Sequence, residues 1–582
     1  MNVNNSVILC GLNARYVHTN LALRDLAAYV RLHWQDAPPI EICEWTINDQ
    51  EMQILQRLYR KQASVYAFSC YIWNITLIRR LSRDLKKLLP EALIVWGGPE
   101  AGFAASRWLE SDPAVDLIIR GEGEAAWLKL LQNLSENDAK PNWAAVPNLC
   151  WHDPDTGVRE NPAAPLLESS AWPFPYSDYD LASLKDRIIY YETSRGCPFC
   201  CSYCLSALDR TVRHRPLPLV FQELDRLMAA GLQQVKLVDR TFNCDPIRAF
   251  QIWQYIIDRA DQAGRTNFHF EVAGDLLDDR TTDLLNQAPS GLIQLEIGVQ
   301  TIQPDVLTAI NRPVRLDVLA RQIERLRMGG RVHLHLDLIA GLPGENLDRF
   351  SESLDWVYRL RPHQLQLGFL KVLPGTPMQQ QAINGGFRWQ DEPPYEILQS
   401  DSLDFADLTL LKSVEQIIDH YLNNGFCDRS LHWLISRQKR PWTCLAAFAD
   451  WAGNQGLLDR SLGAAERCRM LHQFGLDSDQ ELSSNEWLGQ VWRDLLRLDY
   501  LASGQKDQPE WLAYEQTDTS AALRFFKRRH PDSGRLRVIE LAFNWLCFTE
   551  SDVLQPAKWL LCLDFSGNRP VVLDNCRADV LY

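Results

Sequence analysis

Residues 192–204 read ETSRGCPFCCSYC, and this stretch decides the fold. It begins at the end of the run 188–193, IIYYET, whose β-branched and aromatic residues are typical of a strand. Four of the chain's fifteen cysteines fall within eight residues here. Thiolates are soft ligands, suited to iron–sulfur clusters or to zinc. The stretch therefore predicts a metal centre in the loop after a strand.

Two ligand sets are possible for this loop. Cys197, Cys200, Cys201 and Cys204 form two C-x-x-C pairs, but zinc knuckles are usually separated by a dozen or more residues, whereas these abut. Cys197, Cys201 and Cys204 alone, spaced C-x3-C-x2-C, can hold three irons of a 4Fe–4S cluster and leave the fourth iron open. We expect the second set, with Cys200 as a bystander.

A series of strand–helix units continues from this loop. Six units in about 200 residues predict a partial (β/α)6 barrel of the TIM type over residues 186–400. Its strands are expected at 188–193, 235–238, 267–271, 292–297, 332–339 and 364–370.

The regions on either side differ in pattern. Residues 1–140 alternate strand and helix, which predicts a doubly wound, flavodoxin-like parallel sheet. Residues 141–185 are expected to be a connecting segment with some short strands, and residues 401–582 a mainly helical domain with strands near its end, at 535–544, 558–565 and 571–573. A turn is expected at Ser566-Gly567-Asn568 between the last two.

Composition limits the cellular setting and the partners. The formal net charge of -14 disfavours binding of nucleic acid. The sequence contains no run of eighteen apolar residues, so no membrane-spanning helix is expected. We find no signal peptide, and an odd number of scattered cysteines is typical of a reducing compartment. A cytoplasmic protein is expected.

Candidate binding residues stand at predicted strand ends. In the barrel these are Asp239, Glu271 and Gln300, at the mouth where such barrels place their active sites. In the first sheet the candidates Ser69, Gly97, Gly98 and Glu122 follow strands, where ligands of parallel sheets bind.

The cysteine spacing, with Tyr203 before the third cysteine, resembles the radical S-adenosylmethionine superfamily. The resemblance implies a 4Fe–4S cluster on Cys197, Cys201 and Cys204, with S-adenosylmethionine on the open iron. It also implies that Tyr203 packs near the adenine and that the three strand-end residues surround the nucleoside. The chain is similar in layout to the branch with a cobalamin-binding domain, which implies that Ser69, Gly97, Gly98 and Glu122 hold cobalamin.

One departure concerns the cobalt. Many cobalamin modules carry Asp-x-His-x-x-Gly, whose His binds cobalt from below, and this sequence has no such stretch. His18 lies in the first loop in a different context, so we expect cobalt without a lower His ligand. Loss of cobalamin binding is the alternative.

The implied activity is formation of a 5′-deoxyadenosyl radical, used to methylate an unactivated carbon of an unknown small molecule or peptide. An electron donor such as flavodoxin or ferredoxin would be needed. The alternatives are a radical rearrangement or cyclisation without methyl transfer, and a non-enzymatic cobalamin or redox sensor. An RNA-methylthiolating enzyme shares the barrel, but its basic β-rich tail has no counterpart in this acidic, Trp-rich tail.

Overall fold

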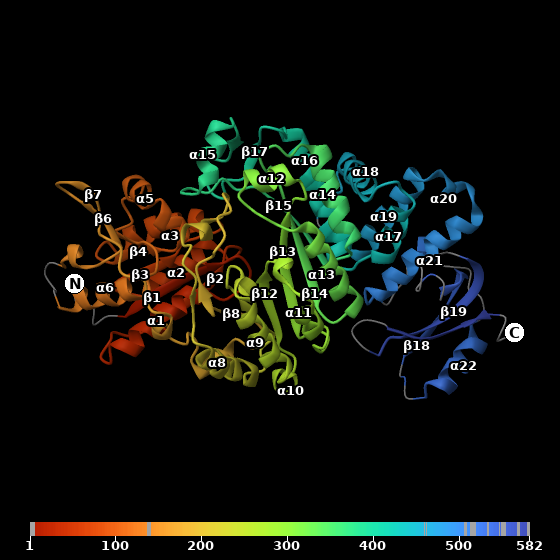
Figure 1. The fold of residues 1–582 in the computed structure, drawn as a ribbon, viewed down its shortest axis with the longest axis horizontal. Helices are drawn as coiled ribbons and strands as arrows, with labels where there is room; N and C mark the ends of the chain where they lie inside the picture. The colour runs from red at the N-terminus through yellow and green to blue at the C-terminus, as the bar shows by residue number, and fades with distance from the viewer. Residues whose placement is uncertain are drawn as a thin grey trace. The chain divides into compact units, whose positions relative to one another are not determined.

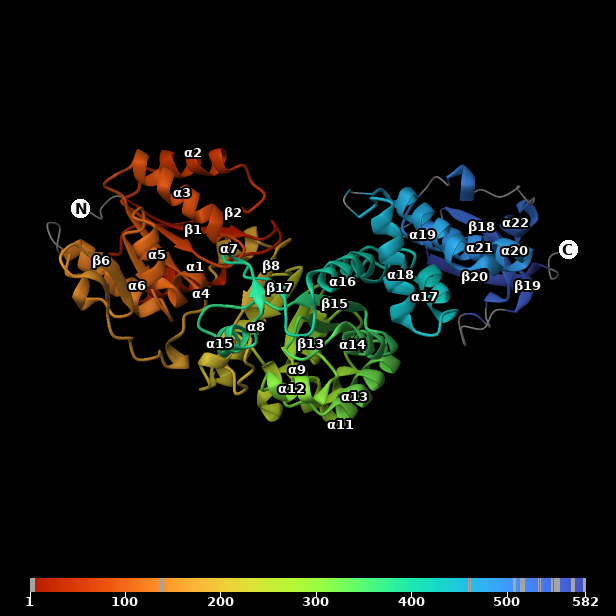
Figure 2. The same cartoon turned by 90° about the horizontal axis from the view of Figure 1, so that it is seen from above.

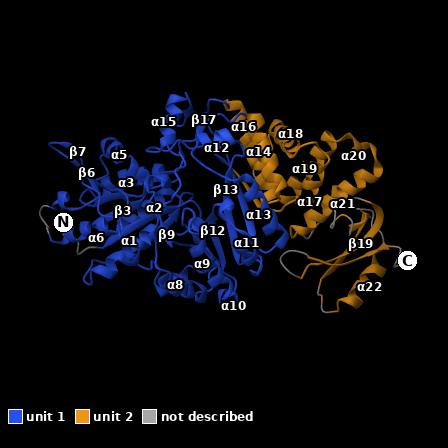
Figure 3. Ribbon diagram, in the orientation of Figure 1, with its two compact units in different colours: residues 1–346, 368–403 blue, residues 347–367, 404–582 orange. Residues whose placement is uncertain are grey.

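The computed structural model describes residues 6–136, 141–458, 460, 462–505, 509–512, 519–531, 533, 535–545, 548, 555–566 and 571–578. The chain forms two compact units, coloured separately in Figure 3. Unit 1 comprises residues 1–346 and 368–403, and unit 2 comprises residues 347–367 and 404–582. The domain boundaries expected at 140, 185 and 400 stay predictions. Part of the expected 566–568 turn lies outside the described residues.

The first sheet of unit 1 has the order β2-β1-β3-β4-β5-β6-β7. Its first five strands are parallel, and the order 2-1-3-4-5 is that of flavodoxin-like folds, as predicted. The strands are β1 (Val7–Asn13), β2 (Ile40–Thr46), β3 (Val65–Ser69), β4 (Leu93–Gly97) and β5 (Leu117–Ile119). The antiparallel strands β6 (Leu149–Asp153) and β7 (Gly157–Glu160) extend it, so the sheet is mixed and reaches into the expected connecting segment.

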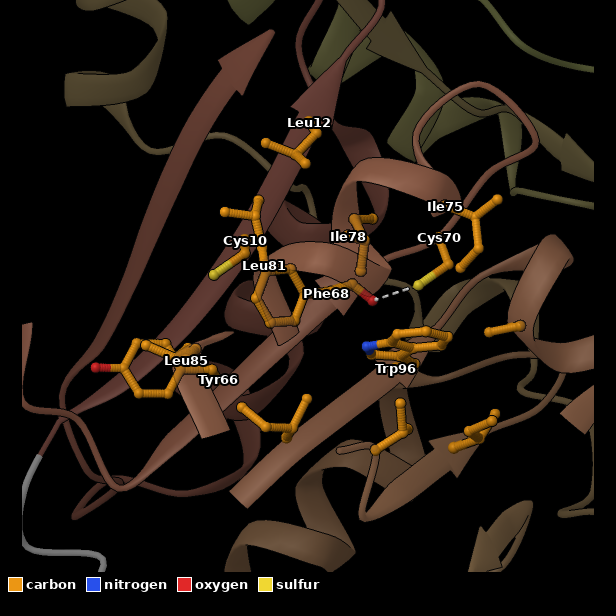
Figure 4. Close-up of a cluster of buried hydrophobic side chains, with 14 of the residues drawn as sticks. Cys10, Leu12, Tyr66, Phe68, Cys70, Ile75, Ile78, Leu81, Leu85 and Trp96 are labelled. Carbon is orange, nitrogen blue, oxygen red and sulfur yellow. Dashed lines mark hydrogen bonds between the residues drawn. The ribbon is translucent and has the colours of Figure 1, made fainter. Parts of the chain in front are cut away.

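Alternate residues along the strands of this sheet pack into two separate hydrophobic cores, one on each face. One core joins the strands to α2 (Glu51–Lys61), α3 (Ile75–Leu88), α4 (Pro99–Phe103) and α5 (Ala105–Ser111). The other joins them to α1 (Leu21–His33) and α6 (Glu124–Glu136), and in Figure 2 α2 and α3 lie on the other side of the strands from α1. Figure 4 shows the first core, where Trp96 donates to Ser82 Oγ at 3.0 Å and Cys70 Sγ lies 3.6 Å from the Phe68 carbonyl. Helices on both faces make the sheet doubly wound.

The central sheet has the order β15-β14-β13-β12-β11-β8, and strands β8 to β14 pair in parallel (Figure 1). The strands are β8 (Ile188–Tyr191), β11 (Gln234–Leu237), β12 (Asn267–Val272), β13 (Ile293–Gln300), β14 (His333–Ala340) and β15 (Gln364–Phe369). Helices between them include α8 (Leu217–Ala229), α9 (Pro246–Ile257), α11 (Asp279–Leu285), α12 (Pro304–Ala309), α13 (Leu316–Gly329) and α14 (Leu347–Arg359). Six strands that do not close match the predicted partial barrel.

The free edge of β8 is covered by the loop after β1. His18 forms a parallel bridge with Ile188, and the Ile188 N–H donates to the Val17 carbonyl at 2.7 Å. The Thr19 hydroxyl donates to the Ile188 carbonyl at 2.8 Å. The first domain therefore contributes hydrogen bonds to the edge of the second sheet.

Unit 2 is mainly helical, as predicted. Its helices include α16 (Phe405–Ile417), α17 (Asp428–Ser436), α18 (Pro441–Asn454), α19 (Ala464–Ser478), α21 (Glu486–Ala502) and α22 (Ser520–Arg529). A three-stranded antiparallel sheet follows, made of β18 (Leu536–Phe543), β19 (Pro556–Asp564) and β20 (Val571–Arg577). Among the described helices, none combines the length and apolar character needed to cross a membrane.

Candidate active site

The cysteine loop starts from a tight backbone crossing. Gly196 has φ +93°, and a Cβ there would lie 2.3 Å from the Thr211 carbonyl oxygen. The Cys197 N–H donates to the Asp209 carbonyl at 2.9 Å, and the preceding strand β9 (Ser194–Arg195) pairs antiparallel with β10 (Arg213–His214). Only glycine fits this crossing, which fixes where the first cysteine emerges.

The sulfur atoms face the ends of neighbouring strands. Arg312 Nη1 lies 3.6 Å from Cys201 Sγ while Nη2 donates to the Gly298 carbonyl at 2.6 Å, and Cys197 Sγ lies 3.6 Å from Thr241 Oγ1. Burial raises the pKa of the Cys201 thiol, and the Arg312 guanidinium opposes that rise. Sequence reasoning missed Arg312, because only the fold brings it to this loop.

The arrangement fits a cluster better than a single metal ion. Nowhere in the described parts of the chain do three His, Cys, Asp or Glu side chains converge enough to hold one ion, so the zinc set gains no support. Cluster thiolates bind different irons and need not converge on one point. Cys200 is half-buried between Phe199 and Cys201. Tyr203 is half-buried, and burial raises the pKa of its phenol.

Asp239 lies directly behind the loop. Its carboxylate accepts hydrogen bonds from the Thr193 N–H at 3.0 Å, the Thr193 hydroxyl at 2.6 Å and the Ser194 hydroxyl at 2.6 Å. The residue is 1% exposed, and burial raises the pKa of its carboxyl against these bonds. The geometry therefore fits anchoring of the loop more directly than the predicted contact with the nucleoside.

Gln300 ends β13 in a strained conformation. Its φ is +69°, and the register between β13 and β14 shifts at this point. The amide folds over Gly298, where a Cβ would lie 2.1 Å from Gln300 Nε2. Its buried Oε1 has no hydrogen-bond partner among the described residues. Strain of this kind gathers at functional sites, and the orphan oxygen is available to a ligand donor.

Glu271 belongs to a charged group that sequence reasoning missed. Lys236 Nζ lies 2.8 Å from Glu296 Oε2 and 3.3 Å from Glu271 Oε1. Burial opposes ionisation of Glu296, but His269 and the Lys236 ammonium hold the pKa of its carboxyl below the usual range. All of these residues alternate with buried apolar ones, so they share one face. We call it the inner face; its titratable residues are Tyr190, Lys236, His269, Glu271, Glu296, His333, His335 and Asp337.

The carboxyl edge of the first sheet carries small residues side by side. Gly11, Ser69 and Gly97 are neighbours in register across β1, β3 and β4. Gly98, at φ +98°, packs against the chain, since a Cβ there would lie 2.6 Å from the Cys70 carbonyl oxygen. Small side chains at this edge permit close approach of a large ligand, which fits a corrin. Gly98 itself is explained by packing.

Glu122 does not join that edge. Its carboxylate pairs with Arg213, which follows the cysteine loop, and it lies 3.8 Å from Arg195. Arg195 also contacts Glu124 at 2.7 Å and Glu192 at 2.8 Å. Glu122 thus sits in an ion-pair network between the first domain and the loop.

His18 faces the central sheet. Its Nδ1 lies 2.6 Å from the Tyr190 hydroxyl, and Lys236 and two arginines contribute to the lowering of its pKa, although burial is the main cause. The expectation of cobalt without a lower His ligand stays a prediction.

Family models match three parts of the chain. Residues 8–131 match the B12 binding domain, residues 191–357 the radical SAM superfamily, and residues 385–538 a protein family of unknown function, DUF4080. The chain thus contains a B12-binding domain followed by a radical SAM domain. The cofactors of these families are cobalamin and a 4Fe–4S cluster with S-adenosylmethionine, as expected from the resemblance.

Relatives of this radical S-adenosylmethionine protein include the cobalamin-dependent radical SAM methyltransferase TokK of Streptomyces tokunonensis, 27% identical over 54% of the chain and 48% of TokK. The 2-(S-pantetheinyl)-carbapenam-3-carboxylate methyltransferase of Streptantibioticus cattleyicolor is 25% identical over 64% of the chain and 59% of the relative. The chain thus spans about half the length of these relatives. The structure of OxsB with aqua-cobalamin and S-adenosylmethionine shares the fold, with TM-score 0.58, 16% identity, and coverage of 90% of the chain and 75% of OxsB.

Proposed function

We propose that the protein cleaves S-adenosylmethionine reductively and methylates an unactivated carbon of a small molecule or peptide. The carrying observation is the cysteine loop at the strand ends of the central sheet, with the Arg312 guanidinium 3.6 Å from Cys201 Sγ. The methyltransferase names of the relatives support methyl transfer. When bound, the cluster would supply the electron for cleavage and cobalamin the methyl group. An electron donor such as flavodoxin or ferredoxin would reduce the cluster.

The chain's own residues would hold and shield the reactants. Cys197, Cys201 and Cys204 would bind three irons, and Asp239 would keep their loop in place through Thr193 and Ser194. Gln300 and Glu271 at the strand ends would position the nucleoside beside Tyr203. Positioning of this kind can lower a barrier by several kcal/mol. Ser69 and Gly97, with Gly11, would form the floor for cobalamin.

The ligand assignment is tested by single alanine changes in the anaerobically reconstituted full chain. We expect about four irons per chain, lost in Cys197→Ala, Cys201→Ala and Cys204→Ala because each thiolate holds its own iron. Cys200→Ala is the matched control and should keep the cluster spectrum. A cluster that survives Cys201→Ala but not Cys200→Ala would refute the assignment.

The activity is tested by chemical reduction of the iron-loaded protein with S-adenosylmethionine. 5′-Deoxyadenosine should form even without substrate, and Glu271→Ala should slow its formation at unchanged iron content. Reduced, iron-loaded protein that neither binds S-adenosylmethionine nor forms 5′-deoxyadenosine would favour the sensor alternative.

A further inference from the structure

The inner face of the central sheet carries more charge than loop anchoring or barrel packing requires. The opposite face of the same strands is apolar and fully buried, as shown by Val235, Leu237, Phe268, Phe270, Leu295, Ile297, Leu334 and Leu336. Burying an ionised group costs several kcal/mol unless it is paired. Charged residues on the inner face therefore need partners.

The charges on this face do not balance. Lys236 is the one cation among the strand residues described there, against the carboxylates of Glu271, Glu296 and Asp337. One positive and three negative groups leave a net charge of -2 with the imidazoles neutral. Burial lowers the pKa of His269, which keeps that ring neutral near pH 7. Protonation of His335 beside Asp337 would still leave an acidic excess.

The histidines give an independent sign that a ligand is missing. His269 and His335 are each 6% exposed. Their Nε2 atoms lie 3.0 Å from Glu296 Oε2 and 2.9 Å from Asp337 Oδ1, but neither contact has the alignment of a hydrogen bond. Asp337 Oδ1 also has no aligned donor among the described residues. Buried polar atoms are normally satisfied, so the unaligned acceptor, Asp337 Oδ1, is open to a group that donates hydrogen bonds.

The carboxylates remain reachable. Side-chain exposure is 29% for Glu271, 21% for Glu296 and 17% for Asp337. Glu296 lies two residues before Gly298, whose carbonyl accepts from Arg312, so it sits one step deeper along β13 than the cysteine loop. A group bound there would lie below the reactants held at the strand ends.

We infer that the inner face binds a cationic nitrogen group of the substrate, an alkylammonium held chiefly by Glu296. One protonated amine would offset half of the excess negative charge, a diamine would offset all of it, and either would supply N–H donors to the carboxylates. This inference names a substrate class for the proposed enzyme and so rests on the proposed function.

The test uses three probes of equal carbon length, putrescine, butanediol and succinate, on the reconstituted full chain. Each is titrated while the thermal unfolding midpoint and 5′-deoxyadenosine release are followed. Of the three probes, only putrescine should raise the thermal unfolding midpoint. In Glu296→Gln its apparent affinity should fall by about tenfold or more, as for loss of one partner of a desolvated charge pair. Lys236→Met should raise the apparent affinity for putrescine, because Glu271 and Glu296 then lose the ammonium group that pairs with them.

Glu41→Gln is the matched control, since Glu41 also pairs with a lysine, Lys61, but in an exposed position. It should leave putrescine binding unchanged, which excludes general attraction to an acidic protein. Equal effects of putrescine and butanediol, or an unchanged response in iron-loaded Glu296→Gln, would overturn the inference. A Glu296-dependent amine response in protein that never releases 5′-deoxyadenosine would defeat the proposed function and leave the amine site standing.

Discussion

Among the glycines of the first sheet, Gly98 is the one at which an added methyl group should lower the free energy of unfolding most. Its φ of +98° and the Cys70 carbonyl oxygen, which would lie 2.6 Å from a Cβ at this position, exclude a side chain. Gly98→Ala should lower the free energy of unfolding by roughly 1–3 kcal/mol more than Gly157→Ala. Gly157 also has positive φ, +78°, but open space around it. Urea unfolding of both variants measures the difference; equal losses would contradict the packing argument.

Sequence reasoning locates the residues whose chemistry is local. Spacing alone predicts Cys197, Cys201 and Cys204 as ligands, and its place after a strand makes Gln300 a predicted site residue. It misses Lys236, Glu296 and His269, because each is an ordinary polar residue within its own strand. Their meaning comes from the register, which places Lys236 opposite His269 and Glu271 opposite Glu296. Register between strands is a tertiary property that one strand's pattern does not contain.

Between elements, Asn74 joins the ends of β1 and β3. Its amide donates to the Leu12 carbonyl at 3.0 Å and the Ser69 carbonyl at 2.9 Å, and its oxygen accepts from the Tyr71 N–H at 2.7 Å. Asn74→Ala would leave these buried groups unsatisfied and should cost on the order of 2–3 kcal/mol of unfolding free energy. Exposed Asn454→Ala should change it by about 0.5 kcal/mol or less. Chemical unfolding compares them, and a similar small loss in both would refute the role.

The sequence predicts the six strands of the central sheet within a few residues, because buried strands are apolar runs bounded by turns. It predicts β6 and β7 only as unspecified short strands, without their membership of the first sheet. They are short and partly polar, and what makes them part of the sheet is pairing with the edge strand β5. Such pairing depends on a distant partner, so the sequence pattern of residues 141–185 does not indicate it.

Across unit 1, the Tyr395 hydroxyl donates to Glu100 Oε1 at 2.5 Å, joining residues far apart in the chain. Burial raises the pKa of the Glu100 carboxyl to about 7, although the Tyr395 hydrogen bond opposes the rise. Because the folded state holds this proton more tightly than the unfolded state, stability should fall as pH rises from 4.5 to about 7. The expected loss is on the order of 2–3 kcal/mol.

Urea unfolding of the wild type and Glu100→Gln over this pH range measures the Glu100 contribution. The glutamine variant has no proton to lose there, so its stability should vary less with pH. Parallel pH curves for the two proteins would show that Glu100 does not titrate in this range.

The hydrogen bonds that join Ile188 to Val17 and Thr19 have a consequence for exchange of domains. Family models treat the B12-binding and radical regions as separate segments, yet the first supplies the border of the second's open sheet. An uncovered strand border is a template for association with other chains. A chimaera with a different N-terminal domain would therefore have to keep this short loop. Without it, the edge strand β8 would be exposed and would promote aggregation.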